Sequence, residues 1–432
     1  MLPDIRQTDY LYPIPKFDLN QKDIEDFERQ LEGYHDYFAD CFKRIELQGH
    51  FYRYMAGQFC ELERKSIEPI AFAVEGGKVR AMQRFVSDAI WDEERILHKY
   101  HDLVNEDLGD PDAAIIFDES GFVKKGENSI GVARQYCGTI GKVENCQIGV
   151  FAAYTSSYGY ALIDKRLYIP EKWFSEEYSE RCKKNNLPGD VKFQTKPQLA
   201  AEMLLEIDRK KQLPFRYILA DSVYATNPDF IDAAESLINV TYMGQIPKNT
   251  LCWLKRPATI KTHINYKGKP RVKKVLSPDS KTPISAEEIA NNIHDFFWYR
   301  RKVSEGTKGP IEYEFTKRRV VLSREGLPTK TVWLFIRRSV RNGDDNPIHS
   351  YYISNAAVST RLDKFVWLSG LRWSIEQCFE ETKTELGMDQ YEVRKYHGWH
   401  HHMLTCILAH FFLWHLKIIM GKKSTSYYSL AA

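Results

Sequence analysis

Two aspartates stand at positions from which they could bind metal ions. Asp118 follows the apolar run AAIIF, and Asp221 follows the apolar run YILA. Such runs indicate buried strands, and carboxylates at strand ends lie where loops leave room for a ligand. Mg²⁺ prefers oxygen ligands and uses one or two carboxylates together with phosphate oxygens. The two aspartates therefore predict a shared divalent-metal site, which a third carboxylate would normally complete.

The third carboxylate is expected on a helix over residues 371–386. Glu376 follows Arg372 by one helical turn and precedes Lys383 by two turns, so the three side chains fall within about 40° of one another around the helix. A carboxylate between two cations suits phosphodiester chemistry, because the cations can bind phosphate oxygens. The same spacing also fits a solvated helix face with ordinary i,i+4 ion pairs. Glu380, one turn further on, is the main alternative to Glu376.

The elements that must position these residues indicate an α/β fold. Residues 20–105 have the apolar spacing of helices, and a long apolar helix ends the fold. Strands and helices alternate between these regions, and two of the strands end in aspartate, which is the layout of an RNase-H-like core. The expected strands are 113–117, 147–154, 158–168, 217–220, 239–245 and 350–354. The expected helices are 194–210 and 227–237, between these strands, and 371–386, after the last of them.

Charge is distributed unevenly along the chain. The 432 residues carry a net charge of +3, with 28% charged residues. Residues 1–110 contain 14 Lys and Arg against 23 Asp and Glu, a balance of −9, whereas residues 241–340 contain 21 against 8, a balance of +13. Aromatic residues are interleaved with the basic ones in this second stretch. Phosphates need positive charge and unstacked bases need flat apolar faces, so the stretch favours nucleic-acid binding; the alternative is a solvated β-rich domain with aromatic core residues.

Several function classes are not supported by the sequence. The glycines after Asp118 are too dispersed for a phosphate-binding loop and no G-K-[ST] follows them, so we expect no nucleotide cofactor. The eight cysteines contain no C-x-x-C pair, which favours reduced thiols in the cytoplasm. We see no signal peptide. The apolar segment 403–420 is interpreted as a buried helix rather than a membrane span.

The histidines at 397, 400, 401 and 402 invite a zinc interpretation. Metal-binding histidines need a defined geometry and outer hydrogen-bond partners. Four histidines near the start of a helix more often pack in the core or contact phosphate, so packing or phosphate contact is preferred here over zinc.

Longer motifs give the chain a family resemblance. Arg372-Trp-Ser-Ile-Glu376 and Lys383 match a Tyr-x2-Arg-x3-Glu-x6-Lys signature, except that Ser369 replaces the tyrosine. Five further stretches resemble motifs of one protein family and occur in the same order as in that family. They are ERKSIEPIA (63–71), QRFVSDAIWD (83–92), DESGFVKKGENSIGVARQYCGTIGKVENCQIGV (118–150), ADSVY (220–224) and HGWHHHMLTCILAH (397–410). With these motifs, the chain resembles the bacterial insertion-sequence seven-oh-one family of DDE transposases from about residue 50 to 415.

The resemblance implies a catalytic mechanism. Asp118 and Asp221 would hold one Mg²⁺ jointly and Glu376 would help to hold a second, with Mn²⁺ able to substitute. Water would cut a strand at the transposon end, and the freed 3′-hydroxyl would attack target DNA. Arg372 and Lys383 would bind phosphates near the end. The expected partners are terminal inverted repeats and target DNA, bound by a homodimer that is cytoplasmic and associated with the nucleoid, without membrane contact.

Other residues are expected to bind DNA. Trp298 is the candidate for holding a flipped base, although a core tryptophan is an equal alternative. Backbone phosphate contacts are expected from basic residues, namely Lys124, Arg134, Lys273, Lys274, Arg300, Arg301, Lys317, Arg318 and Arg319. The alternatives to a transposase are a metal-dependent nuclease that does not join strands, and a domesticated DNA-binding protein with a silent site.

The resemblance also implies a domain order. The acidic N-terminal region is expected to bind the terminal repeat through a local basic face, with dimerisation or packing as the alternative. The expected parts are a helical N-terminal DNA-binding domain (1–110), the first part of the RNase-H-like core (111–240), a basic β-rich insertion (241–347), the second part of the core (348–420) and a C-terminal tail (421–432).

Overall fold

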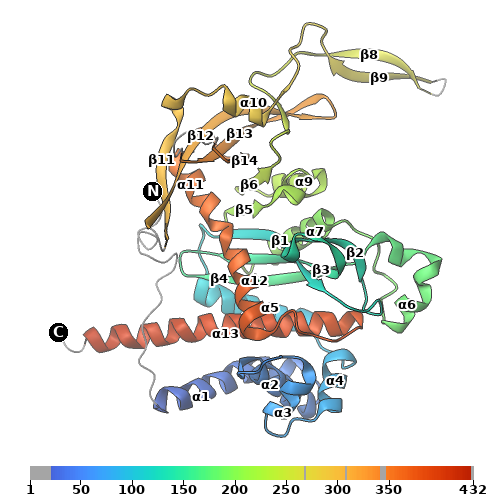
Figure 1. Cartoon of the computed structure of the whole chain (residues 1–432), viewed down its shortest axis with the longest axis vertical. Helices are drawn as coiled ribbons and strands as arrows, with labels where there is room; N and C mark the ends of the chain where they lie inside the picture. Colours follow the sequence, from blue (N-terminus) through green and yellow to red (C-terminus); the bar gives the residue numbers. More distant parts are fainter. Residues whose placement is uncertain (1–20, 267–268, 307–308, 341–346, 430–432) are drawn as a thin grey trace. The chain divides into compact units, whose positions relative to one another are not determined.

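The chain forms two compact units in the computed structural model, which describes residues 21–266, 269–306, 309–340 and 347–429. The larger unit comprises residues 21–216 and 372–429, and the smaller unit comprises Tyr217–Leu371. Both contain helices and strands (Figure 1), so the mixed α/β class expected from the sequence is confirmed.

The larger unit combines a four-stranded sheet with helices from both ends of the chain. Its strands are β1 (Ala114–Val123), β2 (Ala133–Cys137), β3 (Lys142–Thr155) and β4 (Tyr160–Tyr168). Its α-helices are α1 (Gln21–Phe38), α2 (Ile45–Phe59), α3 (Ile67–Ala73), α4 (Val79–Ser87), α5 (Glu93–Leu108), α6 (Ser179–Lys184), α7 (Lys196–Lys210), α12 (Trp373–Leu386) and α13 (Tyr396–Ser429).

The sheet of the larger unit is antiparallel and is built around β3. Strand β1 pairs with β3 along its whole length, and β2 and β4 also pair with β3. The expectation that the first strand ends at Asp118 is wrong, because β1 continues to Val123. Residues after Asp118 keep their partners on β3, down to the pair of Val123 with Cys146. Asp118 therefore lies in the middle of a strand, opposite Phe151.

Helix α13 is the central helix of the larger unit. It contacts β4, α12 and the N-terminal helices α1, α2, α4 and α5, and Figure 1 shows it running along the strands and α5. The Tyr34 hydroxyl of α1 donates to the Leu408 carbonyl at 3.1 Å. The segment Tyr396–Ile419 is long and apolar enough to cross a membrane, but 67% of its most apolar window is buried inside the structure, as in a core helix.

The N-terminal helices thus share a unit with β1–β4 instead of standing apart from them. The expected tail at 421–432 begins inside α13, which extends to Ser429.

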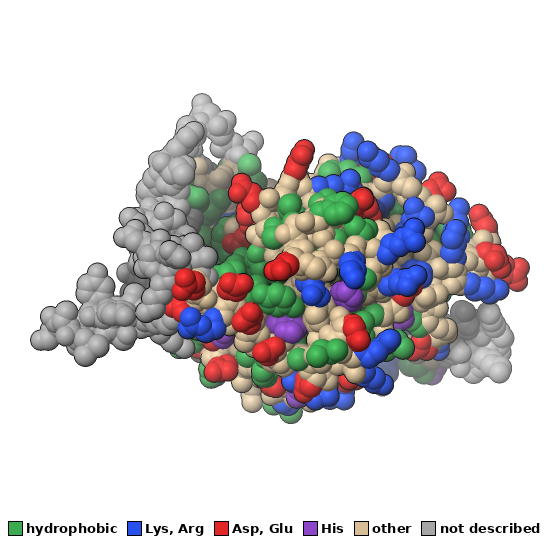
Figure 2. Space-filling model, turned by 90° about the horizontal axis from the view of Figure 1, so that it is seen from below, with side chains coloured by type: hydrophobic (Ala, Val, Ile, Leu, Met, Phe, Trp, Pro, Cys, Tyr) green, Lys and Arg blue, Asp and Glu red, His purple; other side chains and the backbone are tan. Residues whose placement is uncertain are grey.

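Figure 2 shows one face of the molecule, on which Lys and Arg side chains are denser on the right-hand side while acidic side chains are spread more evenly.

The smaller unit is rich in strands. Its strands are β5 (Tyr217–Ala220), β6 (Thr241–Ile246), β7 (Leu251–Trp253), β8 (Thr259–Tyr266), β9 (Lys269–Leu276), β10 (Ile284–Ser285), β11 (Tyr299–Gly306), β12 (Gly309–Arg324), β13 (Leu327–Ser339) and β14 (His349–Ser354). Its α-helices are α8 (Ser222–Ala225), α9 (Pro228–Ser236), α10 (Ala286–Asn291) and α11 (Leu362–Leu371).

Most strands of the smaller unit form one sheet. Their order is β10-β7-β12-β13-β14-β6-β5, and β11 pairs with β12. Strands β5 and β6 are parallel, whereas the other pairs are antiparallel. Strands β8 and β9 form a separate hairpin. The expected basic insertion begins at residue 241, but β6 lies within that range and pairs with β5, the strand that precedes Asp221.

Candidate active site

Asp118 and Glu376 converge on one cation in the larger unit. Oδ2 of Asp118 accepts from Nη1 of Arg372 at 3.3 Å, and Oε1 of Glu376 accepts from Nη2 of the same guanidinium. The exposed fractions of the side chains are 16% for Asp118 and 47% for Glu376. Two carboxylates far apart in the sequence therefore face a common position that a cation can occupy.

Local structure explains this convergence. Arg372 stands at the N-cap position of α12, and Glu376 follows one turn later in the same helix, which is the spacing at which helical side chains meet. Oδ1 of Asp118 accepts from the backbone N–H of Glu119 at 2.8 Å. Side chains alternate along a strand, so Glu119 points away from Asp118 and pairs with Lys196 of α7 at 2.6 Å.

Asp221 lies in the smaller unit, directly after β5. Its carboxylate accepts from the backbone N–H of Val223 at 2.9 Å and thereby caps the short helix α8. The position immediately after a buried strand is the one that the sequence predicts for it. The end of that strand leaves the carboxylate at the start of a helix, where a negative charge is stabilised.

Lys383 lies on α12 but does not join Arg372 and Glu376. Its ammonium donates to Oγ1 of Thr139 at 3.1 Å and lies 5.4 Å from the centre of the Phe122 ring. Burial lowers its pKa, while nearby Asp389 partly counters that effect. The Lys383 side chain reaches towards β1, where its ammonium lies 3.5 Å from the carbonyl oxygen of Gly121, and its phosphate contact stays a prediction.

Lys124, expected to contact phosphate, is packed inside the larger unit. Its ammonium donates to the carbonyl of Tyr391 at 2.9 Å and lies 3.3 Å from the centre of the Tyr391 ring. Burial lowers the pKa of Lys124 to about 7, against the opposing charges of Asp389 and Glu392. These contacts engage the Lys124 ammonium within the protein. Arg134, which was also expected to contact phosphate, is exposed on β2.

Trp298, the candidate for holding a flipped base, is only 7% exposed. The guanidinium of Arg338 lies 4.1 Å from the centre of its ring, and Arg338 itself is held by Glu314 and Asp295 at 2.7 Å and 2.9 Å. A base could reach the Trp298 ring only if these residues moved. The exposed rings beside it belong to Phe296 and Phe297.

Three consecutive cations of β12 differ in their surroundings. Lys317 donates to the carbonyl of Thr360 and lies 4.3 Å from the centre of the Trp333 ring, and burial lowers its pKa. Arg319 donates to the carbonyl of Thr331 at 3.0 Å, and Arg318 lies 4.7 Å from the centre of the Phe297 ring. The phosphate contact expected from Lys317 would therefore compete with contacts inside the unit.

The remaining predicted cations are more accessible. Lys273 and Lys274 are exposed on the β8–β9 hairpin. Arg300 is 3.8 Å from Glu312, and Arg301 pairs with Asp363 at 2.9 Å. Both arginines remain exposed.

One polar network was not indicated by the sequence. Glu381 of α12 accepts from the Tyr160 hydroxyl of β4 at 2.7 Å and contacts Nε2 of His410 in α13 at the same distance. Gln377 adds a further bond at 2.9 Å. Burial raises the pKa of Glu381, but these hydrogen bonds outweigh it and the net pKa is lowered. The network fixes α12, and with it Glu376, on the sheet and α13.

The donor set fits a divalent metal. Asp118 and Glu376 offer carboxylate oxygens, the ligands that Mg²⁺ and Mn²⁺ prefer, and their side chains already face a shared cation, the guanidinium of Arg372. Asp221 offers the same chemistry at the end of β5. Asp118 and Glu376 have the carboxylate oxygens that a divalent cation needs as ligands.

The chain is similar to a protein family, to a curated relative and to a solved structure. A family model described as "DDE superfamily endonuclease" matches residues 37–310, a range that contains Asp118 and Asp221 and ends before Glu376. The chain is 23% identical over 367 residues to the "Probable transposase for insertion sequence element IS701" of Microchaete diplosiphon, and the match covers 85% of this chain and 82% of the relative. A solved structure of the piggyBac transposase synaptic complex with hairpin DNA aligns with a TM-score of 0.40 and 8% identity, over 91% of this chain and 73% of that one.

Proposed function

Because this chain belongs to the DDE superfamily endonuclease family, we propose that Asp118, Asp221 and Glu376 are the catalytic carboxylates with which it cuts transposon ends and joins them to target DNA. The family match and the similarity to an insertion-sequence transposase make it a DDE-type transposase, a metal-dependent enzyme. The observation that carries the residue assignment is the meeting of Asp118 and Glu376 at one guanidinium.

The carboxylates would divide the metal ions between them. Asp118 and Asp221 would hold one Mg²⁺ and Glu376 would help to hold another, within an RNase-H-like core. Bound in this way, the ions supply activation of the attacking oxygen and stabilisation of the leaving oxygen. Helix α12 places Glu376, and the hydrogen bonds of Glu381 to β4 and α13 keep that helix in place.

Arg372 has a second role in this proposal. Its guanidinium already reaches both carboxylates, so it is also within reach of a phosphate held beside them. Arginine binds phosphate oxygens through two parallel hydrogen bonds. Arg372 would thus exchange a carboxylate partner for the scissile phosphate and orient it for attack by water, and later by the 3′-hydroxyl.

The test uses duplexes that carry the inverted repeats bracketing the gene. The substitutions Asp118→Asn, Asp221→Asn and Glu376→Gln should each abolish cleavage in Mg²⁺ and leave binding of the end in a gel-shift assay unchanged. Glu380→Gln is the matched control on the same helix and should cut normally. Normal cleavage by Glu376→Gln would refute the assignment of that residue, and cutting without strand joining by the parent would identify a plain nuclease.

We also propose that α3 and α4 form a helix-turn-helix that binds the terminal repeat. Helices α2, α3 and α4 pack on one another, and a tight turn joins α3 to α4. Gly76 in that turn has a φ of +66°, and a Cβ on Gly77 would lie 2.1 Å from the carbonyl oxygen of Ala71. Only glycine fits these positions, which supports a turn of the kind that joins such helices.

The faces of α4 support its role as the recognition helix. Met82, Phe85 and Val86 are buried, whereas Arg80 and Gln83 are exposed. Arg84 adds exposed positive charge. The second helix of a helix-turn-helix enters the major groove, where arginine and glutamine read base edges.

Substitutions on the exposed face of α4 test this surface. Arg80→Ala and Gln83→Ala should weaken binding to the terminal repeat relative to a scrambled duplex, by about 1–3 kcal/mol for each base that the substituted side chain reads. Arg29→Ala, at an exposed position on α1, is the control. Equal weakening on repeat and scrambled DNA would show that α4 contacts only the backbone.

The smaller unit would supply contacts to the DNA backbone. Lys273 and Lys274 on the hairpin, together with Arg300 and Arg318, are the cations best placed for this role by their exposure or by a stacked aromatic neighbour. A homodimer would bind two ends at once, one for each copy of the catalytic site.

A further inference from the structure

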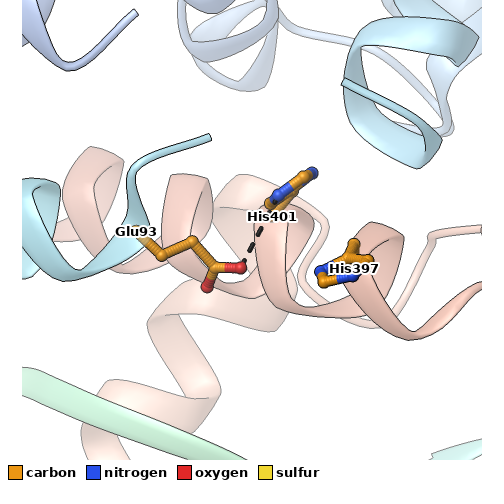
Figure 3. A group of neighbouring side chains, drawn as sticks. All are labelled: Glu93, His397 and His401. Atoms are coloured by element: carbon orange, nitrogen blue, oxygen red, sulfur yellow. Dashed lines mark ion pairs between the residues drawn. The ribbon is translucent and has the colours of Figure 1, made fainter. Parts of the chain in front are cut away.

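A second group of potential metal ligands lies in the larger unit. Glu93 is the first residue of α5, and His397 and His401 stand one turn apart on α13 (Figure 3). Each side chain offers one ligand atom, and the three atoms lie within 4.8 Å of one another. The separation of Oε1 of Glu93 from Nε2 of His401 is 3.6 Å. Residues four apart on a helix share a face, which explains why both imidazoles reach the start of α5.

The His401 ring is held in the orientation that a metal ligand needs. Its Nδ1 donates to the carbonyl of Val86 at 2.8 Å, so Nε2, which faces Glu93, carries the lone pair. The indole of Trp91 is stacked on the ring, with centroids 4.0 Å apart and planes 4° from parallel. A backbone carbonyl on the second nitrogen is the usual outer partner of a metal-binding histidine.

The Glu93 carboxylate is held from the other side. Oε2 accepts from the Lys165 ammonium at 3.0 Å, while Oε1 faces His401. The two oxygens thus serve different partners, and the one that faces the histidines is the one left for a metal. Hydrogen bonding of a ligating carboxylate to an outer residue is also common at metal sites.

We propose that Glu93, His397 and His401 bind a divalent transition-metal ion, with Zn²⁺ the best fit, at a site separate from the catalytic carboxylates. Two imidazole nitrogens and one carboxylate oxygen form a known three-ligand zinc set that leaves a fourth position for water. Two nitrogen ligands disfavour Mg²⁺, which prefers oxygen. The ion joins α5 to α13 and, through the carbonyl of Val86, to the end of α4.

The experiment measures metal binding by the full chain in an Asp118→Asn, Asp221→Asn, Glu376→Gln background, so that the catalytic carboxylates do not contribute. After treatment with a chelator, the protein is titrated with Co²⁺, followed by its visible absorption, and then with Zn²⁺ as competitor. We expect one equivalent of Co²⁺ to bind, Zn²⁺ to displace it, and Zn²⁺ to raise the midpoint of thermal unfolding.

Two variants separate this site from non-specific binding. His397 is exposed, so His397→Ala should keep its fold and lower the affinity for Zn²⁺ by more than about 100-fold, since loss of an outer partner alone costs 10–100-fold. His98→Ala, an exposed histidine on α5, should bind metal like the parent. Equal Zn²⁺ affinity and stoichiometry in His397→Ala and the parent would overturn the proposal, as would the absence of the Co²⁺ band in the parent.

Discussion

His402 gives the structure a specific weakness to acid. It is fully buried on α13, with 0% exposure. The Tyr54 hydroxyl lies 2.7 Å from its Nδ1, and its Nε2 lies 3.1 Å from the carbonyl of Met388. The neutral ring with hydrogen on Nε2 satisfies both contacts, because it accepts from Tyr54 and donates to Met388. A proton added to Nδ1 would place a charge in the core.

The size of the effect follows from the pKa. Burial lowers the pKa of His402 to about 4, although the hydrogen bond to Met388 opposes this change, whereas a histidine in the unfolded chain has a pKa of about 6.5. Between these values the unfolded state binds more protons, so stability falls as the pH is lowered through this window. At about 1.4 kcal/mol for each pH unit, the loss is about 3 kcal/mol.

The assay compares the parent with His402→Gln, which can form hydrogen bonds but cannot take up a proton. Urea unfolding at pH 7, 6, 5 and 4 gives the free energy of unfolding of each protein. The substitution changes the free energy of unfolding at pH 7 by some amount. Between pH 7 and pH 4, the difference in unfolding free energy between the parent and His402→Gln should shift by about 3 kcal/mol in favour of the variant. His98→Gln, at an exposed position, should follow the parent. Parallel curves for the parent and His402→Gln would refute the reasoning.

Three further predictions follow from the placement of individual side chains. Trp298→Ala should lower the free energy of unfolding by about 3–5 kcal/mol, as expected for a core tryptophan. Phe297→Ala, at an exposed ring, should change the free energy of unfolding by no more than about 0.5 kcal/mol. Equal losses for the two variants in denaturant unfolding would place both rings in the core. Lys273→Ala should reduce the slope of log affinity for DNA against log salt concentration by about 1. Lys317→Ala should leave that slope unchanged, because the Lys317 ammonium contacts Thr360 and Trp333. The reverse pattern in filter-binding titrations would contradict this assignment. Burial lowers the pKa of Lys124 to about 7, so the unfolded state binds more protons than the folded state above that pH. The parent should therefore gain stability relative to Lys124→Met as the pH rises from 7 towards 10. A constant difference in unfolding free energy between the two proteins would show that the pKa of Lys124 is that of an ordinary lysine.

Local sequence signals predicted the elements whose ends are chemically marked. Helix α7 begins after Thr195, whose side chain and that of Gln198 form a capping box, and α12 ends at Gly387, which has a φ of +69°. Asp221 was placed correctly because an apolar run stops at it and β5 is short and buried. Each of these features depends on a few neighbouring residues.

Features that depend on distant residues could not be predicted in the same way. β1 extends beyond Asp118 because β3 pairs with it, and nothing in the run of mixed residues 119–123 shows that pairing. The basic stretch shows where positive charge occurs, but the contacts of Lys317 with Thr360 and of Trp298 with Arg338 decide which side chains face the core. The link from Glu381 to Tyr160 and His410 joins three segments that no local pattern connects.

The proposed ligand group illustrates the same limit. His397 and His401 are visible as a pair four residues apart, but their carboxylate partner, Glu93, comes from a helix that precedes the sheet. The preference for packing over zinc was reasonable for His402, which is fully buried and bonded to Tyr54. It does not extend to His397, which is exposed.

The most direct test of the central claim exchanges each proposed catalytic carboxylate for a thiolate. Cysteine binds Mg²⁺ poorly and softer divalent ions better. We predict that Asp118→Cys, Asp221→Cys and Glu376→Cys fail to cut terminal-repeat duplexes in Mg²⁺ and regain part of their cleavage in Mn²⁺, whereas Glu380→Cys cuts equally well in both. Cleavage in Mg²⁺ at the parental rate by any of the first three variants would contradict the claim that these three carboxylates hold the catalytic metal ions.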